Sequence, residues 1–358
     1  MSLYNVEVFS NKFEYRRGSS CQTMESECKN DYLNVSNNKI KLARTNAEKG
    51  DYILITAEDV SYCGIVESCS MKKNVYVIEY KPFITLFDRN AYCNTTLLKT
   101  ETLEKWLAEL VKELYQKNED SLQNITGLDV VATSGTSGAI MVLEKNIENL
   151  YNIFIKALIS YGIVAKFKVD IQGKKLQLKI GKVEKPLFTI EADLPNILES
   201  EFINKKTKES INKLKIYNSE NEIEYITYYL TKNGEVKEKP TENERIIPVI
   251  EDVIFVSFKP DANKVEKTFK TVTYEKAFSE LTPEKYDNLI EIKVDNSDKL
   301  VRPKELEIGQ EVRIIRKEET YNSILTGKEE KDTATKLIFG AIRLELTTIL
   351  KRRLEKRN

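Results

Sequence analysis

The chain has 358 residues, and its 56 lysines and arginines balance its 56 aspartates and glutamates. The length suggests two to four compact units, and the zero net charge gives no overall attraction to nucleic acid or an acidic membrane. No histidine is present, which excludes Ser-His-Asp and Cys-His catalysis, HExxH metalloproteases and carboxylate–histidine metal sites. Paired carboxylates or lysine could still act as catalysts. A chain of this size without histidine indicates a scaffold, not an enzyme.

Residues 1–98 predict a strand-rich first unit, an antiparallel barrel or sandwich, which we assign as a first tube-like barrel. Period-two alternation of apolar residues favours strands at 4–9, 32–36, 51–56, 62–69 and 74–87, the last as two strands broken at Pro82. The start lacks the basic end and apolar block of a signal peptide, and no apolar run is long enough to cross a bilayer. We therefore expect synthesis and first residence in a cytosol.

Residues 99–192 predict a smaller α+β unit. A first helix is capped by Thr100 or Thr102 and carries a leucine stripe beginning at Leu103. A second helix starts near Asn146, and Gly162 is a natural left-handed end for it. A hairpin that turns at Gln172–Gly173 follows.

The rest of the chain predicts a second tube-like barrel, formed by 193–218 and 297–358, with another α+β unit inserted at 219–296. The strand at 211–217 opens this barrel, and a strand at 335–339 and a terminal helix close it. The inserted unit has strands at 223–230 and 249–258, a turn at Asn233–Gly234, and helical turns at 274–281 and 283–289. The predicted fold class is thus multidomain, β-rich and mixed α+β.

Two hairpins in these barrels share one pattern. Gly50 precedes Tyr62 by twelve positions, and Gly309 precedes Tyr321 by the same number. Apolar residues follow each glycine at three and five positions: Ile53 and Ile55, then Val312 and Ile314. Such alternation is typical of half-buried hairpins. One copy in each terminal third indicates a duplicated barrel, with these four side chains pointing inward.

No catalytic, cofactor-binding or metal-binding residue is predicted. The five cysteines (Cys21, Cys28, Cys63, Cys69 and Cys93) form no Cys-x-x-Cys pair, so we expect structural thiols without zinc. Thr133–Gly138 lacks the Lys-Ser/Thr of a phosphate loop and is interpreted as a flexible surface loop. The basic end from Arg343 to Arg357 lacks interleaved aromatics, so no stable nucleic-acid binding is expected. The cluster Tyr225, Tyr228 and Tyr229 is interpreted as core plus cross-strand pairing.

The order of these units resembles the tail-hub or baseplate-hub proteins of long-tailed bacteriophages and contractile bacteriocins. The same fold forms the N-terminal part of siphophage tail-associated lysins. The matching segments, in order, are Gly50-Asp-Tyr-Ile-Leu-Ile, Tyr62-Cys-Gly-Ile-Val-Glu, Tyr80-Lys-Pro-Phe-Ile-Thr-Leu-Phe-Asp, Tyr161-Gly-Ile-Val-Ala-Lys-Phe, Ile211-Asn-Lys-Leu-Lys-Ile-Tyr-Asn, Leu306-Glu-Ile-Gly-Gln-Glu-Val-Arg-Ile-Ile and Lys336-Leu-Ile-Phe-Gly-Ala-Ile-Arg-Leu-Glu-Leu-Thr.

The resemblance implies a structural hub: a homotrimer whose six barrels form a pseudo-sixfold ring. Such a ring joins the tail tube or distal tail protein to a central spike, tape-measure or receptor-binding tip protein. It implies assembly in the host cytoplasm and a final place at the tail tip of a virion or bacteriocin. No peptidase or glycosidase is expected beyond Asn358. The alternatives are a carboxylate-dependent cell-wall hydrolase and a carbohydrate-binding receptor module.

Overall fold

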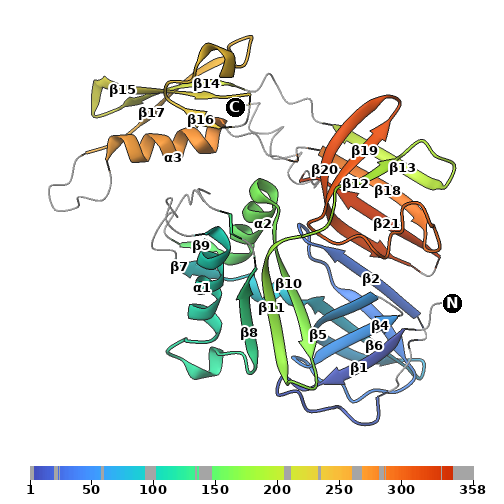
Figure 1. The fold of residues 1–358 in the computed structure, drawn as a ribbon. Helices are drawn as coiled ribbons and strands as arrows, with labels where there is room; N and C mark the ends of the chain where they lie inside the picture. The colour runs from blue at the N-terminus through green and yellow to red at the C-terminus, as the bar shows by residue number, and fades with distance from the viewer. Residues whose placement is uncertain are drawn as a thin grey trace.

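The computed structural model describes residues 4–19, 23, 25–57, 60–92, 102–133, 135–136, 147–204, 211–232, 235–259, 268–281, 286, 288–331 and 333–341. They form a β-rich, multidomain molecule in which one twelve-stranded sheet runs through two of the parts (Figure 1). Predictions for Cys21, Cys93, the Asn233–Gly234 turn and the basic end from Arg343 lie outside these residues.

The first part, called repeat 1, is a set of six antiparallel strands. They pair in the order β1-β4-β5-β6-β3-β2 and are drawn in blue in Figure 1. Alternate side chains of these strands point into a shared core, as period-two patterning requires. The strands are β1 (Asn5–Phe9), β2 (Glu25–Asp31), β3 (Asn38–Leu42), β4 (Tyr52–Ala57), β5 (Val60–Lys72) and β6 (Val75–Pro82).

Two strands expected in this region are wrong. Residues 32–36 form a turn, because the Asp31 carboxylate accepts hydrogen bonds from the backbone of Leu33 (3.0 Å) and Asn34 (3.3 Å). Beyond Pro82 the chain forms the 3₁₀ helix η1 (Phe83–Phe87) in place of a second strand. Its apolar residues face the core at helical spacing, which alternation alone could not distinguish from a strand.

The α+β unit between the repeats places two helices on a three-stranded sheet of order β10-β11-β8. Thr102 caps the first helix through the backbone of Lys105, and Gly162 ends the second at φ 70°, both as predicted. The second helix starts later than expected, after an Asn149 cap. The elements are β7 (Asn90–Tyr92), α1 (Leu103–Tyr115), η2 (Ser121–Gln123), β8 (Leu128–Ala132), β9 (Ile147–Asn149), α2 (Leu150–Tyr161), β10 (Ile163–Asp170) and β11 (Lys175–Lys182).

The second set of six strands, called repeat 2, pairs in the order β12-β19-β20-β21-β18-β13. It is not wholly antiparallel as expected, because β12 runs parallel to β19. The β12 residues, assigned to the α+β unit from the sequence, therefore belong to this sheet. The strands are β12 (Phe188–Glu191), β13 (Ile197–Asn204), β18 (Asn288–Asp295), β19 (Glu311–Arg316), β20 (Glu319–Glu330) and β21 (Ala334–Phe339).

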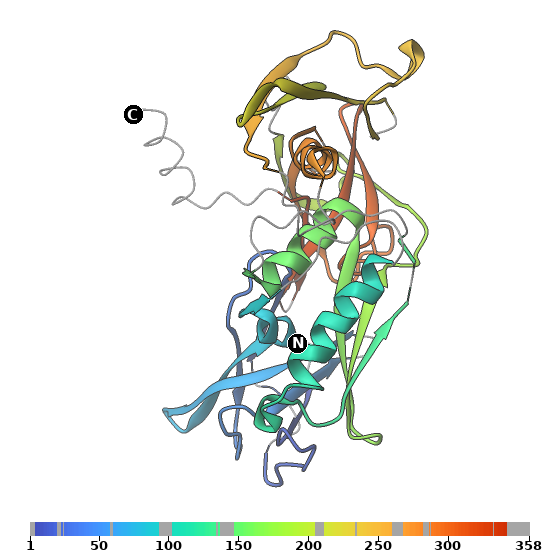
Figure 2. The same cartoon turned by 90° about the vertical axis from the view of Figure 1, so that its left-hand side faces the viewer.

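A four-stranded sheet of order β16-β15-β14-β17 lies at one end of the molecule, with α3 (Phe269–Leu281) against one face (Figures 1 and 2). The strands are β14 (Lys213–Asn218), β15 (Asn221–Leu230), β16 (Val236–Lys237) and β17 (Glu251–Val256), and η3 (Glu242–Glu244) lies between the last two.

Two strand placements predicted for this region are corrected. β14 does not open the second barrel, since it pairs with β15 and β17. β18 includes residues expected to be helical and pairs with β13 and β21 of repeat 2. The inserted sheet therefore lies between β13 and β18 in the chain.

Candidate functional site

The two hairpins noticed in the sequence are equivalent in backbone detail. Gly50 and Gly309, which differ by 259 positions (309 − 50), both have φ 89°. The Gly50 amide donates to the Val66 carbonyl at 2.8 Å, and the Gly309 amide donates to the Leu325 carbonyl at 2.8 Å. Val66 and Leu325 also differ by 259 (325 − 66). Ile53, Ile55, Val312 and Ile314 are all buried, which confirms their inward orientation.

The equivalence continues through a β-bulge. The β5–β6 register shifts between Val66 and Ser68, and the β20–β21 register shifts between Leu325 and Gly327. A bulge bends and twists a strand, and such features are built in. Because both occur at the same offset of 259, the two sheets bend at the same place.

A second offset, of 174 positions (200 − 26), relates the outer strands β2 and β13. Ser26 of β2 pairs with Ile40, and Ser200 of β13 pairs with Ile292. The two strands also share the sequence pattern Glu-Ser-Glu-x-x-Asn, at residues 25–30 and 199–204. This short repeat could have located both strands from the sequence, but the hairpin pattern alone did not.

Among the described strands, one pair joins the two repeats. β2 of repeat 1 pairs with β20 of repeat 2, with Cys28 opposite Glu330 and Asp31 opposite Gly327. The equivalent stretch of β5, Ser68–Met71, pairs only with β6 among the strands that the structure describes, and β13 pairs only with β18. Among the described strands, the outer half of β5 and the free side of β13 are therefore two open edges, one on each repeat.

The joint between the repeats is reinforced by a buried carboxylate. Glu330 of β20 accepts hydrogen bonds from the hydroxyls of Tyr4 (2.7 Å) and Tyr62 (2.5 Å), both in repeat 1. Burial, together with the adjacent Glu330 carboxylate, raises the pKa of Tyr62 well above its ordinary value. The neutral phenol therefore persists as a donor, and it hydrogen-bonds a polar group that would otherwise be costly to bury.

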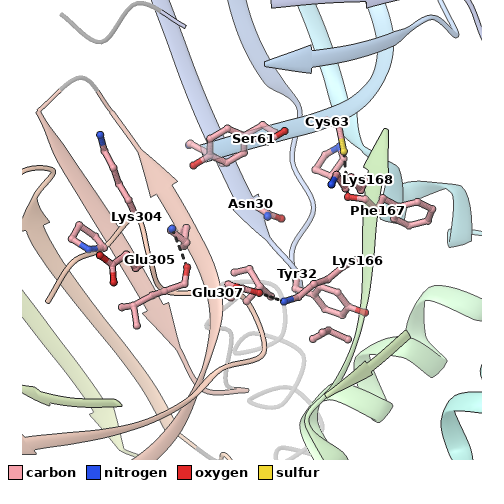
Figure 3. Close-up of a pocket in the computed structure, with 18 of the residues that line it drawn as sticks. Asn30, Tyr32, Ser61, Cys63, Lys166, Phe167, Lys168, Lys304, Glu305 and Glu307 are labelled. Carbon is pink, nitrogen blue, oxygen red and sulfur yellow. Dashed lines mark hydrogen bonds and ion pairs between the residues drawn. The ribbon is translucent and has the colours of Figure 1, made fainter. Parts of the chain in front are cut away.

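A cleft of about 1220 Å³ lies beside this joint (Figure 3). Repeat 1, the β10–β11 hairpin and the loop between β18 and β19 form its walls. Lys166 of β10 reaches across to pair with Glu307 of that loop, as the figure shows. Burial opposes ionisation of Glu307, but hydrogen bonds from Lys166 and Lys185 outweigh it, so the pKa of this carboxyl is lowered. Glu307 is therefore an ionised ion-pair partner and not a proton donor.

The edge of β10 that faces the cleft is already closed by side chains. The Ala165 amide donates to the Tyr32 hydroxyl at 3.0 Å, and the Cys63 thiol donates to the Phe167 carbonyl at 3.5 Å. Burial raises the pKa of Cys63 to about 12, so this thiol is protonated and unreactive at neutral pH. Cys28, Cys63 and Cys69 form no disulfide with one another.

Other features singled out in the sequence have structural roles where they are described. Thr136, in the segment interpreted as a flexible loop, is held by its amide and hydroxyl to the buried Glu104 carboxylate at 2.8 and 2.7 Å. Tyr228 is buried as expected, and Tyr225 forms the expected cross-strand pair with Tyr217 but is 51% exposed. No helix in the described part of the chain is long and apolar enough to span a membrane.

No protein-family model and no curated protein matches the sequence. Solved structures with a similar fold were found. The 43 kDa tail protein of prophage MuSo2 from Shewanella oneidensis has a TM-score of 0.52 at 11% identity, over 94% of this chain and 98% of that one. A tail protein from Neisseria meningitidis MC58 has a TM-score of 0.50 at 12% identity, over 94% and 96% of the two chains. At these identities the similarity shows the fold alone. The chain has a phage tail-type fold.

Proposed function

We propose that the protein is a structural tail component, a hub whose chains close into a ring by strand pairing between subunits. The observation that carries the proposal is the β2–β20 pair, which joins the two repeats within one chain. The same repeats leave β13 and the outer half of β5 without a partner among the described strands. Proteins cover or pair such edges, because an open edge promotes aggregation.

The repeat offsets specify how the edges would meet. In the chain, Cys28 lies opposite Glu330. The offset of 174 relates Cys28 of β2 to Phe202 of β13, and the offset of 259 relates Glu330 of β20 to Met71 of β5. Phe202 would therefore lie opposite Met71 of the next subunit, and Glu201 would lie opposite Lys72. Met71 is 62% exposed in the single chain. An apolar pair beside an opposite-charge pair favours such a contact.

The contact is heterologous, since one edge of each subunit meets the other edge of the next. Contacts of this kind close into a ring when the rotation permits. Three chains with two repeats each give six similar units, the arrangement that lets a sixfold tube meet a threefold tip. The three-subunit count, the two-barrel description and tail partners on both ring faces follow from the resemblance to tail and baseplate hubs.

A charge-swap experiment tests the edge contact. We expect Lys72→Glu or Glu201→Lys alone to reduce assembly, because each places like charges opposite one another. The double variant Lys72→Glu/Glu201→Lys restores the pair and should restore assembly, measured by native mass spectrometry. Lys12→Glu, at an exposed turn outside both edges, is the matched control. Equal behaviour of all four variants contradicts this register.

A structural role in place of catalysis is part of the proposal. A carboxylate-dependent hydrolase needs one carboxyl held protonated by a raised pKa. Glu307, a carboxylate of the cleft, has its pKa lowered instead. Purified protein should therefore not clear a bacterial cell-wall suspension. Clearing that is lost on a single Asp or Glu substitution would overturn this part of the proposal.

A further inference from the structure

The cleft between the repeats is strongly basic, although the whole chain has zero net charge. Among the residues that the structure describes, nine cations and three carboxylates line it, an excess of six positive charges (9 − 3). Lys168 and Lys179 are exposed and form no ion pair with the residues that the structure describes. The nine cations are Lys29, Lys166, Lys168, Lys179, Lys185, Lys299, Arg302, Lys304 and Lys328.

One of these cations is buried. Lys328 is 7% exposed, and its Nζ donates to the Leu306 carbonyl at 3.2 Å. Burial lowers its pKa to about 8, and attraction to Glu330 and Glu307 only partly offsets this effect. An ammonium has three donors, and Lys328 forms no ion pair with the described residues, so its burial is unfavourable. An anion that enters the cleft would gain more from Lys328 than from a solvated surface lysine.

The lining chemistry fits an acidic polypeptide better than a nucleic acid. Eight of the nine cations are lysines, which act as flexible point charges and lack the planar guanidinium fork that holds a phosphate or a carboxylate at two points. Nucleic-acid bases would need open aromatic faces. Phe83 is instead buried against Tyr52 and Phe167, at centroid distances of 5.0 and 5.6 Å. The cleft is also larger than the roughly 300–1,000 Å³ usual for small ligands.

The chain offers no acidic segment of its own to fill the cleft. Of the stretches outside the described residues, 58–59, 287 and 332 carry more acidic residues than lysines and arginines, and none of these three is longer than two residues. The longest stretch, 342–358, is strongly basic. The β10 edge is closed by Tyr32 and Cys63, so strand addition is blocked there as well. An occupant must therefore come from another chain and be recognised by its side chains.

We propose that the cleft between the repeats binds an acidic peptide segment of another protein. Its glutamate or aspartate carboxylates pair with Lys168 and Lys179 at the rim and approach Lys328 at the base. The site does not depend on ring closure. Only the assignment of the partner as a neighbouring tail protein rests on the proposed function.

Binding of a labelled oligoglutamate peptide to the full chain, measured by fluorescence anisotropy at low salt, tests the proposal. We expect Lys168→Glu/Lys179→Glu to weaken binding by roughly tenfold or more. Lys12→Glu/Lys174→Glu makes the same change in net charge at exposed turns outside the cleft and should have little effect. Lys328→Met, with folding checked by thermal unfolding, should also weaken binding.

Two results would overturn the proposal. One is equal loss of binding in the cleft and control variants, which would indicate a general charge effect. The other is tighter binding of inorganic polyphosphate or oligothymidylate through the same lysines, which would assign the cleft to phosphate. The ring-breaking Lys72→Glu variant should keep full peptide affinity, so failure of the ring and failure of the cleft are distinguishable.

Discussion

Repeats 1 and 2 have equivalent strand orders, but they differ at the outer edge of their longest strands, β5 in repeat 1 and β20 in repeat 2. In repeat 2, residues 327–330 of β20 are covered by β2, and the buried Glu330 is satisfied by Tyr4 and Tyr62. In repeat 1, the equivalent residues 68–71 carry small side chains and the exposed Met71. The backbone plan is thus preserved, while the side chains differ between a joint within one chain and an edge left for another.

The first strand of each repeat, β1 or β12, differs in direction as well. β1 runs antiparallel to β4, whereas β12 runs parallel to β19. Two parallel strands cannot be joined by a tight hairpin. The connection from β12 to β19 runs through residues 192–310, which include β13, the inserted sheet and β18. The five strands that follow in each sheet order keep their register in both repeats, which indicates that the core sets the plan and only the first strand varies.

The largest expected effects lie in the equivalent cores. Ile53→Ala in repeat 1 and Val312→Ala in repeat 2 each remove a side chain that is at most 1% exposed. Each should lower the free energy of unfolding by roughly 2–4 kcal/mol, because a cavity replaces packed methyl groups. Urea denaturation of both variants measures it. A cost below about 1 kcal/mol at one site only would show that the two cores are not equivalent.

Alanine substitution at the two equivalent glycines should destabilise repeat 2 more than repeat 1. A Cβ at Gly309 would lie 2.6 Å from a Val164 methyl, whereas a Cβ at Gly50 meets nothing within 4 Å. Both positions share the backbone strain of φ 89°. We expect Gly50→Ala to cost about 1–2 kcal/mol and Gly309→Ala about 1 kcal/mol more, because overpacking adds to the strain. Equal melting temperatures of the two variants would contradict this contact.

Lys328 occupies the position that Cys69 holds in repeat 1, and it should give repeat 2 a pH dependence. Its pKa falls from 10.5 in the unfolded chain to about 8 on folding. Between these values the unfolded chain binds the extra proton, so stability should rise with pH. Between pH 8 and 10.5, the free energy of unfolding of the wild type should rise by about 2 kcal/mol more than that of Lys328→Met. Parallel denaturation curves for both proteins across this range would rule out the effect.

Local patterns predicted the hairpins, the Thr102 cap that begins α1, the Gly162 residue that ends α2 and the inward side chains, because these depend on spacing of two or three to four residues. Non-local pairing was not predictable in the same way. Leu214 and Ile216 alternate with polar residues equally well in either sheet, so β14 was assigned to the wrong one. The β2–β20 joint and the basic cleft bring together residues about 300 positions apart, and no local pattern encodes that.

An electron-microscopy map of the assembled particle tests the central claim most directly. We expect a ring of three chains in which six similar β-units alternate, with β13 of each chain continuing the sheet through β5 of the next. Phe202 should then face Met71 across each of three equivalent contacts. A ring of six chains, a single copy, or a closed ring in which these two edges remain unpaired would contradict the account.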